Sequence, residues 1–254
     1  MNFFKSRKTI FLVPILIWLF SQLFLLEPRF FYISIAFSFL LLAFAIKGME
    51  KEQGSKNWPL FFFFPAILFL GVSLYAALIS DYYWIQFILF LSASFTFYYL
   101  RNIYYFLNYG ALERAEKLNN LMTISGFLSV FTLAATIYGL PTFLGLSFWP
   151  LFVLFIIFTT PLFFQSFVLG RLNILEKWPF FLASIFILAE LTLVLYFLPL
   201  SFNILGFFVA IFYYLILMAL RLTLKNNFSV HTMRWPLIFS SVIITILLLT
   251  ARWF

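Results

Sequence analysis

Nine long apolar segments, separated by short connections, make up most of this chain. Each runs for about 15 to 21 residues, close to the roughly 20 that a helix needs to cross about 30 Å of hydrocarbon. A helix satisfies its own backbone hydrogen bonds, and the segments lack the alternation of a barrel strand. The sequence therefore predicts an all-α, polytopic transmembrane helical bundle of about nine spans, or eight if a short segment lies in the interface. The segments cover residues 10–26, 30–46, 59–79, 82–100, 121–138, 150–168, 179–198, 202–220 and 236–250.

The positive charges predict the orientation of these spans. All but two of the sixteen Lys and Arg residues lie before the first segment or in every second connection; the exceptions are Arg29 and Arg252. Short loops rich in Lys and Arg stay on the cytoplasmic side. We therefore expect a cytoplasmic N-terminus and a row of helical hairpins. The membrane we expect is the plasma (inner) membrane of a bacterium or archaeon.

The composition excludes several functional classes. At 65% hydrophobic and 9% charged residues, the chain is far from a soluble domain, which has about 25% charged residues. The net charge of +8 fits an anionic membrane surface, and no loop has the basic and aromatic pattern of a nucleic-acid site. There is no Cys, and His231 is the single His, so no metal set is expected. We predict no cofactor, metal or catalytic residue and no nucleic-acid partner. The expected partners are the lipid bilayer and possible other membrane proteins, with any small-molecule substrate left open.

A weak repeat suggests how the single integral membrane domain, residues 1–254, is organised. A cation followed by Trp-Pro precedes three apolar segments, at residues 56–59, 177–179 and 234–236. Pro is favoured at the first position of a helix and Trp at the membrane interface. With the matching pairs Tyr98–Tyr99 and Tyr213–Tyr214 further along, this indicates repeated hairpin units 58–117 and 178–234. The alternative is that interface chemistry alone selects Trp-Pro after a cation.

Two connections are expected to differ from plain loops. Residues 101–120 have an apolar face, and Glu113 and Lys117 have the i,i+4 spacing of a helical ion pair. They predict a short cytoplasmic helix at the interface. Residues 139–141 predict an external turn, and 141–149 an external apolar loop.

Glu190 is the ionisable residue expected deepest inside a segment. It follows Pro179 by eleven residues, which places it about 16 Å into the bilayer, near the midplane. A charged side chain at the centre of a span costs about 2.5–3.5 kcal/mol, and no Lys or Arg is expected at this depth. Glu190 is therefore expected to be neutral and to face protein or water.

Pro161 is predicted to lie at the same depth in the preceding segment, because it follows Pro150 by eleven residues. A proline inside a helix leaves the carbonyl four residues earlier without its donor and bends the helix. Thr159 and Thr160 add hydroxyl groups beside the bend. The candidate midplane polar site therefore consists of Glu190, Thr159, Thr160 and Pro161. It is either a coupling carboxylate at a broken helix or a structural hydrogen bond between two spans.

The segment 121–138 is the least suited to contact lipid. It contains several small and hydroxyl side chains, and Ser125 and Ser129 have the spacing that permits close helix approach. We expect a central, protein-covered helix.

Three functional hypotheses follow from these features. The first is a non-enzymatic structural, accessory or sensor-like membrane subunit. The alternative is a transporter or permease-like protein that uses the midplane carboxylate. The third is a lipid-active membrane enzyme, for which the isolated acids Glu27 and Asp81 on the external side provide no supporting motif. The sequence favours a protein that is not an enzyme.

Overall fold

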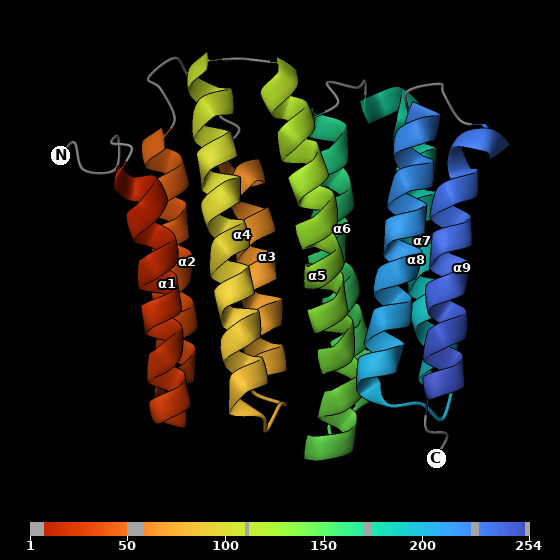
Figure 1. Cartoon of the computed structure of the whole chain (residues 1–254), viewed down its shortest axis with the longest axis horizontal. Coiled ribbons are helices and arrows are strands. Elements are labelled where there is room, and N and C mark those ends of the chain that lie inside the picture. Colours follow the sequence, from red (N-terminus) through yellow and green to blue (C-terminus); the bar gives the residue numbers. More distant parts are fainter. Residues whose placement is uncertain (1–7, 50–57, 110–111, 170–173, 225–228, 252–254) are drawn as a thin grey trace. The chain divides into compact units, whose positions relative to one another are not determined.

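The computed structural model describes residues 8–49, 58–109, 112–169, 174–224 and 229–251 (Figure 1). These residues form α-helices joined by short connections, with no strand among them. A short 3₁₀ helix, η2 (Pro28–Phe30), links the first two α-helices. The described α-helices are α1 (Lys8–Leu26), α2 (Phe31–Met49), α3 (Trp58–Ala76), α4 (Tyr82–Tyr109), α5 (Leu112–Leu144), α6 (Phe148–Leu169), α7 (Ile174–Tyr196), α8 (Phe202–Leu224) and α9 (Val230–Thr250).

Each predicted apolar segment coincides with one of these helices. Seven of them, α1, α2, α4, α5, α7, α8 and α9, contain a stretch long and apolar enough to cross a membrane. The described apolar parts of α3 and α6 are shorter, at Phe61–Ala76 and Phe148–Phe164. The chain is therefore an apolar helical bundle, as predicted.

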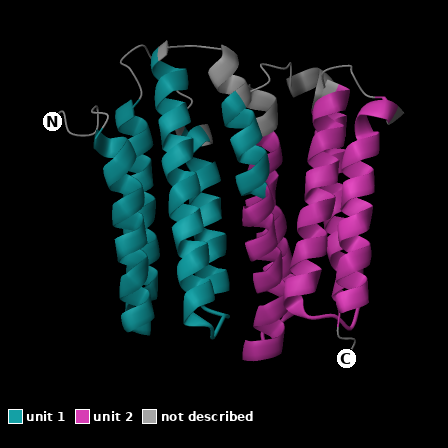
Figure 2. Ribbon diagram, viewed as in Figure 1, with its two compact units in different colours: residues 1–126 teal, residues 127–254 magenta. Residues whose placement is uncertain are grey.

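The chain divides into two compact units, residues 1–126 and 127–254 (Figure 2). In unit 1, each helix from α1 to α4 packs on the next, and α4 also packs on α1. Aromatic rings fill the space between these helices. Phe64 stacks on Tyr99 with ring centroids 5.1 Å apart, and the Tyr99 hydroxyl donates to the Phe61 carbonyl at 2.9 Å.

In unit 2, α7 packs on α6 and α8, and α8 also packs on α9. The later part of α5 packs closely on α8, where Ala135 lies against Gly206 and Phe207 meets Phe127 and Phe131. By contrast, only 11% of the apolar stretch of α9 is buried. Most of the α9 surface is therefore available to lipid.

Two of the three Trp-Pro pairs do not begin a helix. α7 begins at Ile174, five residues before Pro179, and α9 begins at Val230, six residues before Pro236. At α9 the earlier start has a local cause, because the Ser229 hydroxyl accepts from the backbone N–H of Thr232 at 3.2 Å and caps the helix. The described part of α3 begins at Trp58, beside Pro59.

The two connections that were expected to be special lie largely within long helices; of the apolar loop predicted at 141–149, only residues 145–147 are outside a helix. α4 continues to Tyr109 and α5 begins at Leu112, so residues 101–120 do not form a separate interfacial helix. α5 also passes through Pro141 and ends at Leu144, so the predicted turn at 139–141 is wrong. The helix ends at Gly145, which has φ +64° and donates to the Pro141 carbonyl at 3.0 Å.

The tyrosines that suggested a repeat differ in burial. Tyr99 is 1% exposed, whereas Tyr98 is 50% exposed; in the matching pair it is the first tyrosine, Tyr213, that is buried. The buried tyrosine is thus shifted by one position between the two pairs. The repeated units 58–117 and 178–234 stay a prediction.

Candidate functional site

Glu190 lies on the exposed surface of α7. One turn to either side, Ile187 and Val194 are 48% and 55% exposed. The opposite surface of α7 is buried, with Leu188 and Thr192 almost fully covered. The exposed surface formed by Phe186, Ile187, Glu190, Val194 and Phe197 is called the Glu190 face below.

Contacts between α6 and α7 define the depth of Glu190. The ring of Phe148 stacks on Tyr196 at 3.9 Å, and Phe164 meets Phe181 at 6.1 Å. Since the helices are antiparallel, both pairs place Glu190 at the level of residues 154–155. They place Pro161 near residues 183–184, about 10 Å from Glu190 along the helix axis. The structure therefore does not bring Glu190 to the Pro161 bend.

The two threonines beside Pro161 use their hydroxyl groups within α6. Thr159 Oγ1 donates to the Phe155 carbonyl at 2.9 Å, and Thr160 Oγ1 donates to the Ile156 carbonyl at 2.7 Å. Neither hydroxyl bonds to Glu190, which makes no hydrogen bond or ion pair within the described part of the chain. α6 itself remains continuous through Pro161. Of the predicted site, Thr159, Thr160 and Pro161 therefore lie together, and Glu190 lies apart.

The hydroxyl-rich part of α5 is buried, as its composition predicted. Two thirds of its apolar stretch, 67%, is covered. Ser129, Thr132 and Thr136 are almost fully buried, and the two threonines donate to carbonyls four residues earlier in α5. Bonds of this kind keep hydroxyl groups satisfied without a partner helix. This surface therefore offers packing contacts and no set of free donors.

Tyr138 forms a hydrogen bond between helices that was not predicted from the sequence. Its hydroxyl donates to the Thr192 carbonyl of α7 at 2.7 Å. Its ring lies parallel to that of Phe148, which in turn stacks on Tyr196. A tyrosine near the end of a segment rich in small residues was the available signal, but the acceptor on α7 appears only in the fold.

A second polar contact lies in unit 1. The amide groups of Gln22 on α1 and Gln86 on α4 bond to each other in both directions, at 3.1 and 2.6 Å. Each is a polar residue in an apolar segment, so each leaves an amide to be satisfied inside the membrane. The pair is reciprocal and joins the two helices without using charge.

The two acids that were expected on the external side, Asp81 and Glu27, have structural roles. Asp81 accepts from the backbone N–H groups of Tyr83 and Trp84 at 2.9 and 3.2 Å and so caps α4. Glu27 lies 3.5 Å from Arg29 in an exposed ion pair. Across the described residues, no three His, Cys, Asp or Glu side chains cluster in a way that could hold a metal ion.

The chain was also compared with protein-family models, characterised proteins and solved structures. None of these comparisons finds a match. Among the chain's own residues, the most informative is Glu190, an acid that lies within an apolar helix and is exposed on the surface of its unit.

Proposed function

We propose that this chain is a non-enzymatic structural or accessory subunit of a membrane assembly. It binds another integral membrane protein through the Glu190 face, in the plasma membrane of a bacterium or archaeon. The observation that carries the proposal is the exposed carboxyl group of Glu190 within an apolar span. Unit 2 buries the hydroxyl groups of Thr132, Thr136 and Thr192 and leaves this carboxyl group exposed.

The position of Glu190 makes lipid a poor neighbour. It lies six residues before Tyr196, so about 9 Å of helix separates it from the end of α7. Acids within transmembrane helices usually face the bundle interior or pair with another group, because an unpaired charge in hydrocarbon is costly. A partner helix that presents Lys, Arg, His or a hydrogen-bonding amide at this level satisfies the carboxyl group.

The surroundings of Glu190 suit contact with a helix. Ile187 and Val194 provide apolar surface one turn before and after the acid, and Phe186 and Phe197 extend it at the sides. The proposed interface thus consists of one polar group inside an apolar strip. Polar contacts between membrane helices contribute about 0.6 kcal/mol on average and about 1.7 at most, so the apolar packing must supply the remainder of the affinity.

Site-directed photocrosslinking in native membranes tests the proposal. A benzophenone side chain at position 187 or 194 should give the same discrete protein adduct. The matched controls place it at Val242 or Ile246, which are equally exposed on α9, and should give none. Glu190→Leu should reduce the adduct about 3- to 18-fold, the loss that a contact of about 0.6–1.7 kcal/mol implies, while Glu190→Gln, which keeps hydrogen bonding, should retain more of it. An adduct that is unaffected by Glu190→Leu, or equal crosslinking from α9, would refute the assignment.

The same variants separate this proposal from the transporter hypothesis. A coupling carboxylate must exchange a proton, which Gln cannot do. A Glu190→Gln chain that folds and retains its adduct but loses the cellular phenotype of the intact gene would favour transport. A chain that loses adduct and phenotype together would favour the accessory subunit.

A further inference from the structure

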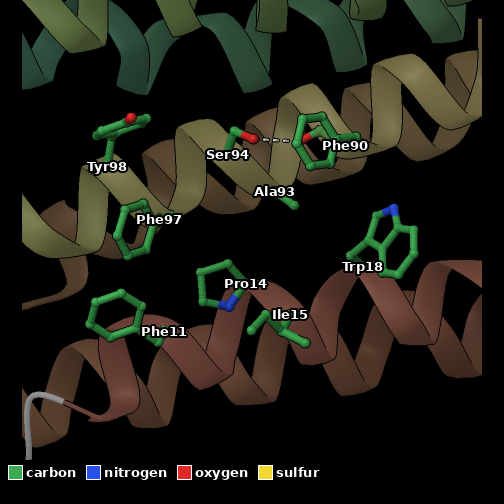
Figure 3. Close-up of a pocket in the computed structure, with 9 residues that line it drawn as sticks. All are labelled: Phe11, Pro14, Ile15, Trp18, Phe90, Ala93, Ser94, Phe97 and Tyr98. Atoms are coloured by element: carbon green, nitrogen blue, oxygen red, sulfur yellow. Dashed lines mark hydrogen bonds between the residues drawn. The ribbon is translucent and has the colours of Figure 1, made fainter.

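A groove of about 420 Å³ runs between α1 and α4 on the surface of unit 1 (Figure 3). Phe11 and Phe97 lie at one end, where their ring centroids are 5.0 Å apart. Trp18 and Phe90 lie at the other end. Phe11 and Phe90 are both more than half exposed, so the groove opens to the outside of the unit.

Short side chains make the groove hollow. Pro14 on α1 and Ala93 and Ser94 on α4 line its middle, between the larger rings at the ends. The Ser94 hydroxyl donates to the Phe90 carbonyl at 2.9 Å, so it is already satisfied within α4. The middle of the groove is therefore almost entirely carbon and suits a hydrocarbon chain.

Two cations lie at the Phe11–Phe97 end. The contacts Phe11–Phe97 and Gln22–Gln86 give the same antiparallel register, which places Lys8 and Arg101 at nearly the same level. Lys8 precedes Phe11 by three residues and Arg101 follows Phe97 by four, so both continue the faces that line the groove. Both side chains are exposed, and neither forms an ion pair with any residue the structure describes.

This arrangement places positive charge directly beside an apolar groove. Tyr98, half exposed, also lies at this end and offers a hydroxyl group. An occupant that matches all three features has an anionic head with several acceptor oxygens and a hydrocarbon chain. Lys8 and Trp18 are ten residues apart on α1, so the hydrocarbon chain of the occupant can lie along about 15 Å of this helix.

We propose that the groove between α1 and α4 binds an anionic phospholipid. Its phosphate lies between Lys8 and Arg101, and one acyl chain extends along the groove toward Trp18. The lipid comes from the leaflet that contains the Lys8 end of α1. A zwitterionic phospholipid of the same chain length fills the groove equally well but gains less from the two cations. The site therefore selects by headgroup charge.

Lipid retention by the purified full chain tests the charge selection. The chain is stripped of lipid in detergent and given dioleoyl phosphatidylglycerol or dioleoyl phosphatidylcholine, and bound lipid is counted by native mass spectrometry. Each cation near a membrane surface strengthens binding of anionic lipid about fivefold, so the combined variant Lys8→Gln with Arg101→Gln should lose about 30-fold. The combination Lys47→Gln with Lys117→Gln removes the same charge from exposed positions outside the groove and should lose little.

A second pair of measurements tests the acyl chain. Ala93→Phe fills the middle of the groove and should reduce retention of both lipids. Lipids with brominated acyl chains should quench tryptophan fluorescence in the parent. Part of this quenching should disappear in Trp18→Phe, a variant that leaves the middle of the groove unaltered. Equal retention of the two lipids by the parent would overturn the proposal. So would equal losses in the two charge variants, or quenching that does not depend on Trp18.

Discussion

The contact between Gly206 and Ala135 gives the sharpest test of how unit 2 is packed. A methyl group at position 206 would lie 2.8 Å from both the Cβ and the backbone N of Ala135. Carbon atoms normally meet at about 3.5–4.0 Å, so α5 and α8 would have to separate locally by about 1 Å. Such separation would also loosen Phe207 from Phe127 and Phe131, whose rings each lie 5.5 Å from it.

Overpacking of this kind costs about 1–3 kcal/mol. In water, replacing Gly by Ala in a helix recovers up to about 1 kcal/mol of that, because Ala favours the helix. In a membrane this gain is small, since a separated span stays helical to satisfy its backbone. We therefore expect Gly206→Ala to lower the free energy of unfolding by about 1–3 kcal/mol, and Gly206→Leu to lower it further.

Reversible unfolding in mixed micelles with increasing dodecyl sulfate measures this loss. The control Val242→Ile adds one carbon to an exposed position on α9 and should change the stability by less than about 0.5 kcal/mol. Adding Ala135→Gly to Gly206→Ala should restore only part of the loss, because the contact with the backbone N remains. A Gly206→Ala chain as stable as the parent would refute the close approach of α5 and α8.

Three further measurements follow from the polar groups and the turns. Tyr138→Phe removes the hydroxyl that bonds to α7 and should cost about 0.6–1.7 kcal/mol in the same unfolding assay. Replacing Gln22 by Leu should cost more in the parent than in a chain that already carries Gln86→Leu, because the single change leaves a half-buried amide unpaired. A reporter fused after Gly48 should be cytoplasmic and one fused after Gly145 external; the same location for both would contradict the predicted orientation.

The helices were predictable because each apolar segment has one physical explanation. A run of about twenty apolar residues has to satisfy its backbone internally, and the helix is the local way to do so. The helix ends were less predictable. Trp-Pro was expected to mark the point where a helix enters the lipid, but α7 and α9 begin before that dipeptide, at Ile174 and Val230. The hydrophobic pattern reports the membrane boundary and not the hydrogen bonds that begin a helix.

The candidate site shows a similar limit. Glu190 and Pro161 were assigned one depth by counting eleven residues from Pro179 and Pro150. This count assumes that the two prolines lie on opposite sides of a 30 Å layer. The contacts between α6 and α7 place the two prolines only about 23 Å apart along the helix axis. Eleven residues span about 16 Å, which is more than half of that distance, so Glu190 and Pro161 each lie past the midpoint between the prolines. The Tyr138 bond and the Gln22–Gln86 pair depend on tertiary contacts that no local pattern contains.

The length of α4 and α5 has a practical consequence for imaging this protein. The chain has a mass of 30.0 kDa and no soluble domain among the described residues, so it gives electron microscopy little to align. α4 runs for 28 residues and α5 for 33, about 42 and 50 Å, whereas the hydrocarbon accounts for about 30 Å. Both helices are therefore longer than the hydrocarbon is thick, and the cations Arg101 and Lys117 lead us to expect the excess at the end of α4 and the start of α5. A rigid helical protein inserted there, in phase with both helices, would provide a fiducial mark outside the membrane without altering the Glu190 face or the groove between α1 and α4.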